Sequence, residues 1–169
     1  MKIISYRLNN ATSYGVLVNN ELYSLPENQS GLPPTMNAFL ALEESGMEMA
    51  RQTAQQIEAG ALVANPVSNY EILAPVPHPT SCRDGYAFRQ HVASARKNRG
   101  VDMIPEFDQF PIFYFTNHNA IQGPGDIDCM PDHFEKLDFE LEAAIVVGKR
   151  GRNIKASEAD EYIAGYMIM

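Results

Sequence analysis

The sequence has no tryptophan and only two cysteines among its 169 residues. Cys82 and Cys129 form no CxxC motif, which argues against a disulfide framework and against a structural zinc site. Its longest apolar runs fall well short of the roughly 20 residues that a membrane helix needs. The first residues, Met1–Tyr6, have the pattern of a strand rather than of a signal peptide. These absences predict a cytoplasmic protein with no membrane partner.

Positive charge is also scarce. The chain has 13 Lys and Arg residues against 21 Asp and Glu residues, a formal net charge of -8. Nucleic-acid-binding domains usually carry a basic footprint, so this class of partner is excluded. The sequence also contains no GxGxxG, GxxxxGK[ST] or GxSxG motif, which excludes the common phosphate loops and the nucleophile elbow.

The first third of the chain has clear local patterns. They predict strands at residues 2–8 and 14–25 and a helix at residues 36–59. Asn19 and Asn20 divide the second strand segment into a hairpin, since Asn favours tight turns. Gly60 is a stop signal for the helix, and Gly46 is a point at which the helix divides.

Prolines punctuate the middle of the chain. Four of them lie between residues 62 and 79, which predicts an extended linker with a short strand at Tyr70–Leu73. We therefore expect a domain boundary near residue 75, with a small β/helix domain at 1–75 and a second domain at 76–169. The expected elements of the second domain are a helix at 85–99 ended by Gly100, a strand at 110–115, a strand at 137–148, a short helix at 156–161 and a strand at 163–169.

The last residues, Gly165–Met169, form an apolar strand with no polar tail. Most domains end in exposed, poorly ordered residues. The expectation is therefore that the polypeptide continues beyond Met169.

An acidic strand offers the strongest chemical signal. Side chains alternate between the two faces of a strand, so Asp138, Glu140 and Glu142 share one face, with neighbours about 6 to 7 Å apart. The other face is wholly apolar and consists of Phe139, Leu141, Ala143, Ile145 and Val147. A solvated acidic face is one interpretation. A cation site is the other, because Glu is a poor strand former and clustered carboxylates repel without a cation or protons between them. Oxygen ligands select Mg²⁺, Mn²⁺ or Ca²⁺.

Other polar residues precede this strand. Asp84 is either a third ligand or the N-cap of the expected helix. His91 would lie two helical turns after Asp84, about 10 Å along the axis, where it is either a packing residue or a general base. Tyr86 and Tyr114 either pack or present a hydroxyl group. The same helix also carries several basic residues. They either form a solvated face or attract an anionic substrate, and they are Arg89, Arg96, Lys97 and Arg99.

Three segments together resemble the fumarylacetoacetate hydrolase family, in the same order. They are Asp84–His91, Leu137–Glu142 and Gly165–Met169. The LDxExE pattern in the second segment is the most specific. The resemblance begins near Ala74 and implies the N-terminal half of a larger, bacterial-type member. The implied fold is α+β and mostly β: a small barrel-like N-terminal domain, then the first part of a mixed β-roll.

The resemblance also implies a site. Asp84, Glu140 and Glu142 correspond to ligands of Mg²⁺, with Ca²⁺ or Mn²⁺ as alternatives, and a fourth acid would lie just past Met169. His91 corresponds to the base that activates water. The residues implied to contact substrate are Tyr86, Tyr114 and either Arg99 or Arg96. Asp138 is expected to be a structural or outer acid.

The implied activity is metal-dependent hydrolysis of a C–C bond in a 1,3-diketo acid, by a homodimer acting on a small keto acid. The helix at 85–99 would then be a lid that carries the base. A keto-acid decarboxylase or isomerase on the same fold is an alternative, because both need the metal-stabilised enolate but no attacking water. A non-catalytic metal-binding or scaffold fragment is the other alternative.

Overall fold

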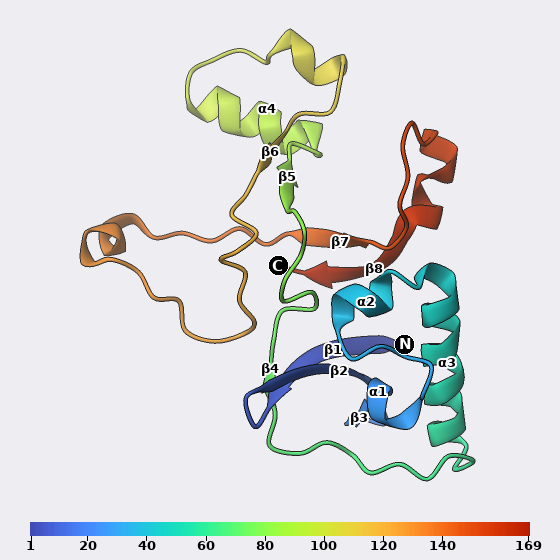
Figure 1. The fold of residues 1–169 in the computed structure, drawn as a ribbon. Coiled ribbons are helices and arrows are strands. Elements are labelled where there is room, and N and C mark those ends of the chain that lie inside the picture. Colours follow the sequence, from blue (N-terminus) through green and yellow to red (C-terminus); the bar gives the residue numbers. More distant parts are fainter. The chain divides into compact units, whose positions relative to one another are not determined.

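Figure 1 shows the fold of residues 1–169, all of which the computed structural model describes. These residues form two compact units. The first unit combines Met1–Pro77 with Gln122–Met169, and the second is His78–Ile121. The expected division into domains at 1–75 and 76–169 stays a prediction. No helix is long and apolar enough to cross a membrane.

A four-stranded antiparallel sheet begins the first unit. Its strands are β1 (Lys2–Leu8), β2 (Ala11–Val18), β3 (Glu21–Ser24) and β4 (Glu71–Ile72), in the order β3-β2-β1-β4. The predicted hairpin at Asn19 and Asn20 is confirmed, with φ angles of 52° and 68° that a tight turn between strands requires. Asn9 and Asn10 make a second turn of this kind, so β2 begins at Ala11 rather than at residue 14.

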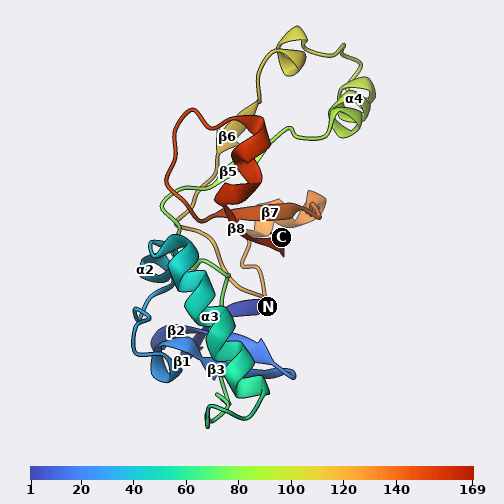
Figure 2. The same ribbon diagram turned by 90° about the vertical axis from the view of Figure 1, so that its right-hand side faces the viewer.

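One face of this sheet supports the hydrophobic core. Tyr14, Val16 and Val18 alternate along β2 and point to the same side. Three helices cover them: α1 (Leu25–Asn28), α2 (Met36–Leu40) and α3 (Glu43–Glu58), with α3 running across the strands in Figure 2. Full burial of a large apolar side chain such as Phe39 contributes roughly 1.5 to 3 kcal/mol.

The helix predicted at residues 36–59 is two helices. It divides between α2 and α3, where Glu43 has a φ angle of 52°, and not at Gly46. Gly46 lies inside α3, and a Cβ atom there would come within 3.0 Å of the Phe39 carbonyl oxygen. Glycine is therefore needed for close approach of the two helices, not for a break. Gly60 follows the end of α3 with a φ angle of 68°, as predicted.

The later part of the first unit contains a second strand pair. Strands β7 (Ala143–Val147) and β8 (Ile163–Ile168) are antiparallel, and the 3-10 helix η3 (Ala156–Tyr162) precedes β8. Another 3-10 helix, η2 (Pro131–Lys136), precedes the acidic segment. The β8 strand and the short helix before it agree with the sequence prediction.

The acidic strand is shorter than predicted. Pairing with β8 reaches back only to Glu142, whose N–H group donates to the Met169 carbonyl oxygen at 2.8 Å. Asp138 and Glu140 have no partner strand in this ladder, so the segment before Glu142 is irregular. The predicted apolar face is also not part of the core, since Phe139 is 84% exposed and Leu141 is 79% exposed.

The α+β class is correct, but the barrel-like N-terminal domain is not confirmed. The four-stranded sheet is open, because β3 and β4 lie at its two ends. The other two sheets contain two strands each, and every strand pair is antiparallel. The expected mixed β-roll is therefore represented here only by small antiparallel pieces.

The second unit is an antiparallel strand pair with a helix between its strands. Its elements are β5 (Arg83–Gly85), α4 (Arg89–Asn98), the 3-10 helix η1 (Pro105–Asp108) and β6 (Phe113–Phe115). The helix predicted at 85–99 begins four residues late, because Gly85 pairs with Phe113 in the strand ladder. It ends as predicted at Gly100, which has a φ angle of 71°.

Candidate metal centre

Asp84 lies in the middle of β5. It is directly opposite Tyr114 in β6, and the Tyr114 hydroxyl group donates a hydrogen bond to Asp84 Oδ2. Asp84 is half-buried. The N-cap interpretation is wrong, because α4 begins only at Arg89 and Phe88 occupies its N-cap position. The Asp84 carboxylate is therefore not engaged in helix capping.

Glu140 and Glu142 lie on the chain segment that leads into β7. Glu142 is half-buried and has a fixed main chain, because its N–H and C=O groups both pair with Met169. Glu140 is exposed. Asp138 differs from both, since its carboxylate accepts a hydrogen bond from the Phe139 N–H group at 2.9 Å. That local bond agrees with the expectation that Asp138 is a structural acid.

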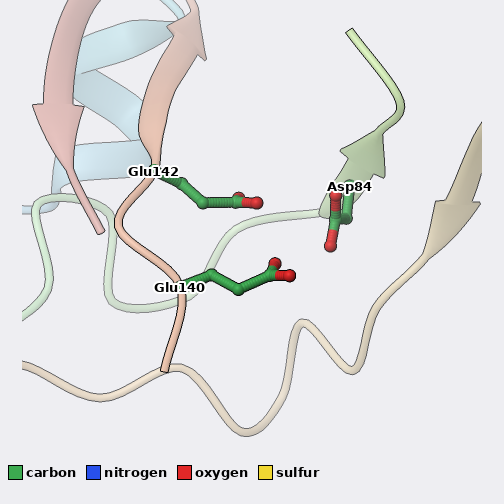
Figure 3. Close-up of side chains that lie close together, drawn as sticks. All are labelled: Asp84, Glu140 and Glu142. Carbon is green, nitrogen blue, oxygen red and sulfur yellow. The ribbon is translucent and has the colours of Figure 1, made fainter. Parts of the chain in front are cut away.

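Figure 3 shows the carboxylates of Asp84, Glu140 and Glu142. Each of these three acids, which together form the acidic trio, offers one carboxylate oxygen atom that could bind a cation. A set of three carboxylate oxygens suits a hard cation such as Mg²⁺, Ca²⁺ or Mn²⁺. Such ions take six or more ligands, so three acids would leave positions for water or for the oxygen atoms of a substrate. The acidic trio is thus chemically suited to a divalent cation.

The remaining site residues predicted from the sequence lie in the second unit. His91 is in the first turn of α4 and is exposed, and Arg99 is the exposed C-cap residue of the same helix. Tyr86 follows β5 and is 39% exposed. The distance expected between Asp84 and His91 along one helix is wrong, because only His91 is helical. The catalytic and substrate-binding roles of these residues stay predictions.

Two contacts near these residues were not found from the sequence. Arg89 forms a bidentate ion pair with Asp108, with distances of 3.1 Å from Nε to Oδ1 and 2.9 Å from Nη2 to Oδ2. This pair joins α4 to η1. The guanidinium group of Arg83 lies over the rings of Phe113 and Phe115, 5.5 Å and 4.6 Å from their centroids. The alternation of aromatic residues in 113–115 is visible in the sequence, but the register that brings Arg83 to them is not.

Comparisons with known proteins place the chain in a family. The family model described as "Fumarylacetoacetate (FAA) hydrolase C-terminal" matches residues 80–169. A Dictyostelium discoideum relative named "Fumarylacetoacetate hydrolase domain-containing protein 2 homolog" is 26% identical over 99% of this chain and 53% of its own length. The human protein named "Oxaloacetate tautomerase FAHD2A, mitochondrial" is 32% identical over 81% of this chain and 40% of its own length.

A solved structure supports the fold. The chain is similar to a fumarylacetoacetate hydrolase from psychrophilic Exiguobacterium antarcticum, with a TM-score of 0.61 and 19% identity. That match covers 99% of this chain and 54% of the solved chain. The chain therefore spans about half the length of the relatives that it matches. It belongs to the fumarylacetoacetate hydrolase family.

Proposed function

We propose that the whole protein uses a divalent cation to convert a small keto acid, such as oxaloacetate, to its enol form. The cation that we propose is Mg²⁺. The acidic trio of Asp84, Glu140 and Glu142 is the observation that carries this proposal. Relatives named oxaloacetate tautomerases, at 31% to 32% identity to this chain, favour keto–enol tautomerisation as the reaction. The solved hydrolase, at 19% identity, supports only the fold.

Tautomerisation moves one proton from the carbon next to a carbonyl group to the carbonyl oxygen. Negative charge develops on that oxygen during the transfer, and a bound divalent cation would supply the positive charge that stabilises it. The three acids would hold this cation, which could then also bind the oxygen atoms of a keto acid. No other reactant is needed, because the proton removed from carbon is balanced by the proton added to oxygen.

The residues of the second unit fit the rest of this chemistry. His91 is exposed in the first turn of α4, and imidazole is well suited to exchange protons near neutral pH. Tyr86 has a hydroxyl group and Arg99 has a guanidinium group, both able to donate hydrogen bonds to a substrate carboxylate. We assign His91 as the base and these two residues as substrate contacts.

Hydrolysis of a C–C bond in a 1,3-diketo acid is the second candidate. A water molecule would attack the carbonyl carbon after His91 takes its proton. The C–C bond would then break, and the enolate that it releases would take up that proton. The exposure of His91 favours this candidate, because water reaches the imidazole ring freely. Product analysis separates the reactions. Hydrolysis yields two products from one substrate, and decarboxylation releases CO₂. Tautomerisation releases no fragment and changes only the ratio of keto to enol form, which ultraviolet absorbance measures.

The partners follow from the same proposal. We expect a small keto acid as the ligand and a homodimer as the assembly, which sedimentation analysis of the purified protein would test. The cytoplasmic location stays a prediction, and several relatives are named as mitochondrial. Fractionation of cells that express the protein would decide between these locations.

The deciding experiment measures cation binding and turnover in the same preparation. We expect Mn²⁺ or Mg²⁺ to bind in calorimetry and to raise the melting temperature, because a ligand of the native state stabilises it. Glu142→Gln should weaken cation binding by about tenfold or more and should slow the tautomerisation of oxaloacetate by a similar factor. Asp138→Asn is the matched control, because that acid bonds locally to the Phe139 N–H group and should leave both measurements unchanged.

Three outcomes would contradict the proposal. A protein that binds no divalent cation would have no metal centre of this kind. Cation binding without turnover of any keto acid would favour the non-catalytic scaffold. Equal losses in Asp138→Asn and Glu142→Gln would show that general negative charge, rather than a ligand set, attracts the ion.

A further inference from the structure

Tyr114 faces Asp84 across the β5–β6 ladder. The two residues are register partners, and the Tyr114 hydroxyl group donates its hydrogen bond to Asp84 Oδ2. Directly opposed residues of an antiparallel pair have Cβ atoms about 4.5 to 5.5 Å apart, so the pairing of the strands itself keeps the phenol beside the carboxylate. The contact belongs to one unit and follows from its local register.

Contacts on either side hold this register in place. Arg83 is paired with Phe115 and Gly85 with Phe113, and the Arg83 guanidinium group lies over both aromatic rings. The ladder extends past both ends through main-chain hydrogen bonds, from Tyr86 N–H to the Ile112 carbonyl at 3.0 Å and from Thr116 N–H to the Cys82 carbonyl at 3.2 Å. A one-residue slip would turn Tyr114 to the opposite face and would break all of these contacts.

The phenol group of Tyr114 can donate only one hydrogen bond, and this limits which other groups it can bind. A tyrosine hydroxyl has a single O–H donor, and here the Asp84 carboxylate accepts it. The remaining lone pairs of the phenol oxygen would repel a substrate carboxylate. Tyr114 therefore cannot donate to the substrate while it holds Asp84. The substrate contact expected from the family resemblance conflicts with this bond.

We propose that Tyr114 is a positioning residue that orients the Asp84 carboxylate for the cation. Its hydrogen bond to Oδ2 fixes the rotation of the carboxylate and leaves Oδ1 available to bind the cation. This inference rests on the proposed metal centre. Partners that fix a metal-binding side chain commonly change metal affinity by about 10- to 100-fold when they are removed.

A double-mutant cycle tests the inference. Calorimetry would measure Mn²⁺ affinity in four proteins: wild type, Tyr114→Phe, Asp84→Asn and the double variant. We expect Tyr114→Phe to weaken Mn²⁺ binding by about tenfold and to have no further effect in the Asp84→Asn background. At saturating Mn²⁺ the KM for the keto acid should stay that of wild type. Tyr114 is 58% exposed, so loss of one oxygen atom should leave the fold intact, as circular dichroism would verify.

Tyr23→Phe is the matched control. Tyr23 also donates from its hydroxyl to a carboxylate, Glu21 Oε2, at 2.9 Å, but that pair lies in β3 and includes no predicted ligand. Its removal should leave Mn²⁺ affinity unchanged.

The remaining outcomes each overturn the inference. Wild-type Mn²⁺ affinity in Tyr114→Phe together with a raised KM would make Tyr114 a substrate contact. If Tyr114→Phe weakened binding equally in the wild-type and the Asp84→Asn backgrounds, Tyr114 would act through another group. Absence of Mn²⁺ binding in the wild type would instead overturn the proposed metal centre, and the positioning role with it.

Discussion

At the residue scale, Gly15 has the tightest surroundings of the glycines that lie in strands. A Cβ atom at this position would lie 2.3 Å from the Tyr23 carbonyl oxygen of the neighbouring strand β3. That oxygen belongs to the backbone, so it cannot move aside as a flexible side chain would. Gly15→Ala should therefore destabilise the protein by about 1 to 3 kcal/mol, measured by urea unfolding.

Gly165→Ala is the control for that measurement. No heavy atom lies within 4 Å of a Cβ atom built at Gly165 in β8, so this substitution should cost little. Equal destabilisation by the two substitutions would show that loss of glycine flexibility, rather than a clash with β3, determines the effect of Gly15→Ala.

The residue scale also shows why the role of Asp84 could not be assigned from sequence alone. The sequence predicts a helix directly after Asp84, so both capping and cation binding were consistent with its position. Its actual environment depends on Tyr114, which lies 30 residues later in the sequence. Local patterns report neighbours along the chain, and the partner of a strand residue is set by the register between distant segments.

At the element scale, α4 has little apolar support. Val92 is its one buried residue, so the helix depends on polar contacts to stay in place. The bidentate pair of Arg89 with Asp108 is such a contact, and the hydrogen bond to Asp108 raises the pKa of Arg89 above its ordinary value. Arg89→Leu should loosen α4, the helix that carries His91.

Hydrogen exchange provides the measurement for α4. Amide groups of the helix should exchange a few-fold faster in Arg89→Leu, because exposed ion pairs contribute modestly to local stability. Arg51→Leu is the control, since Arg51 forms comparable exposed pairs with Glu48 and Glu44 on α3. Exchange in α4 that stays at the wild-type rate would mean that Val92 alone holds the helix.

Elements defined by local signals were predicted well. The Asn19–Asn20 turn, the helix stop at Gly60 and the final strand need only backbone preferences and periodicity. The start of α4 and the extent of the acidic strand were wrong. Both depend on where a partner strand begins and ends, since Gly85 pairs with Phe113 and Glu142 pairs with Met169.

At the scale of the whole molecule, the order of the motifs carried more information than any single motif. Asp84 lies far before Glu140 and Glu142 in the sequence, so no local pattern joins the three acids. The family resemblance grouped them as one candidate set. It did not reveal how the sheets are divided, because the open four-stranded sheet and the two strand pairs depend on long-range packing.

The β7–β8 pair makes a last prediction at this scale, because its apolar face is exposed. Ile145 and Tyr166 are register partners on this face, 54% and 72% exposed, and Ile168 beside them is 75% exposed. A two-stranded pair is marginally stable in water, and contiguous exposed apolar side chains promote association. We therefore expect the 169-residue chain to bind a hydrophobic dye such as ANS and to associate as its concentration rises.

Substitution within this face provides the test. Ile145→Thr combined with Ile168→Thr should lower both dye fluorescence and association in light scattering, because Thr keeps the β-branched shape that suits a strand while removing apolar area. Val63→Thr is the control, since Val63 is 93% exposed and belongs to no helix or strand. An equal decrease in both variants would assign the dye to scattered apolar side chains. A decrease confined to the double variant would assign it to the β7–β8 face, the strand pair that continues directly from Glu140 and Glu142.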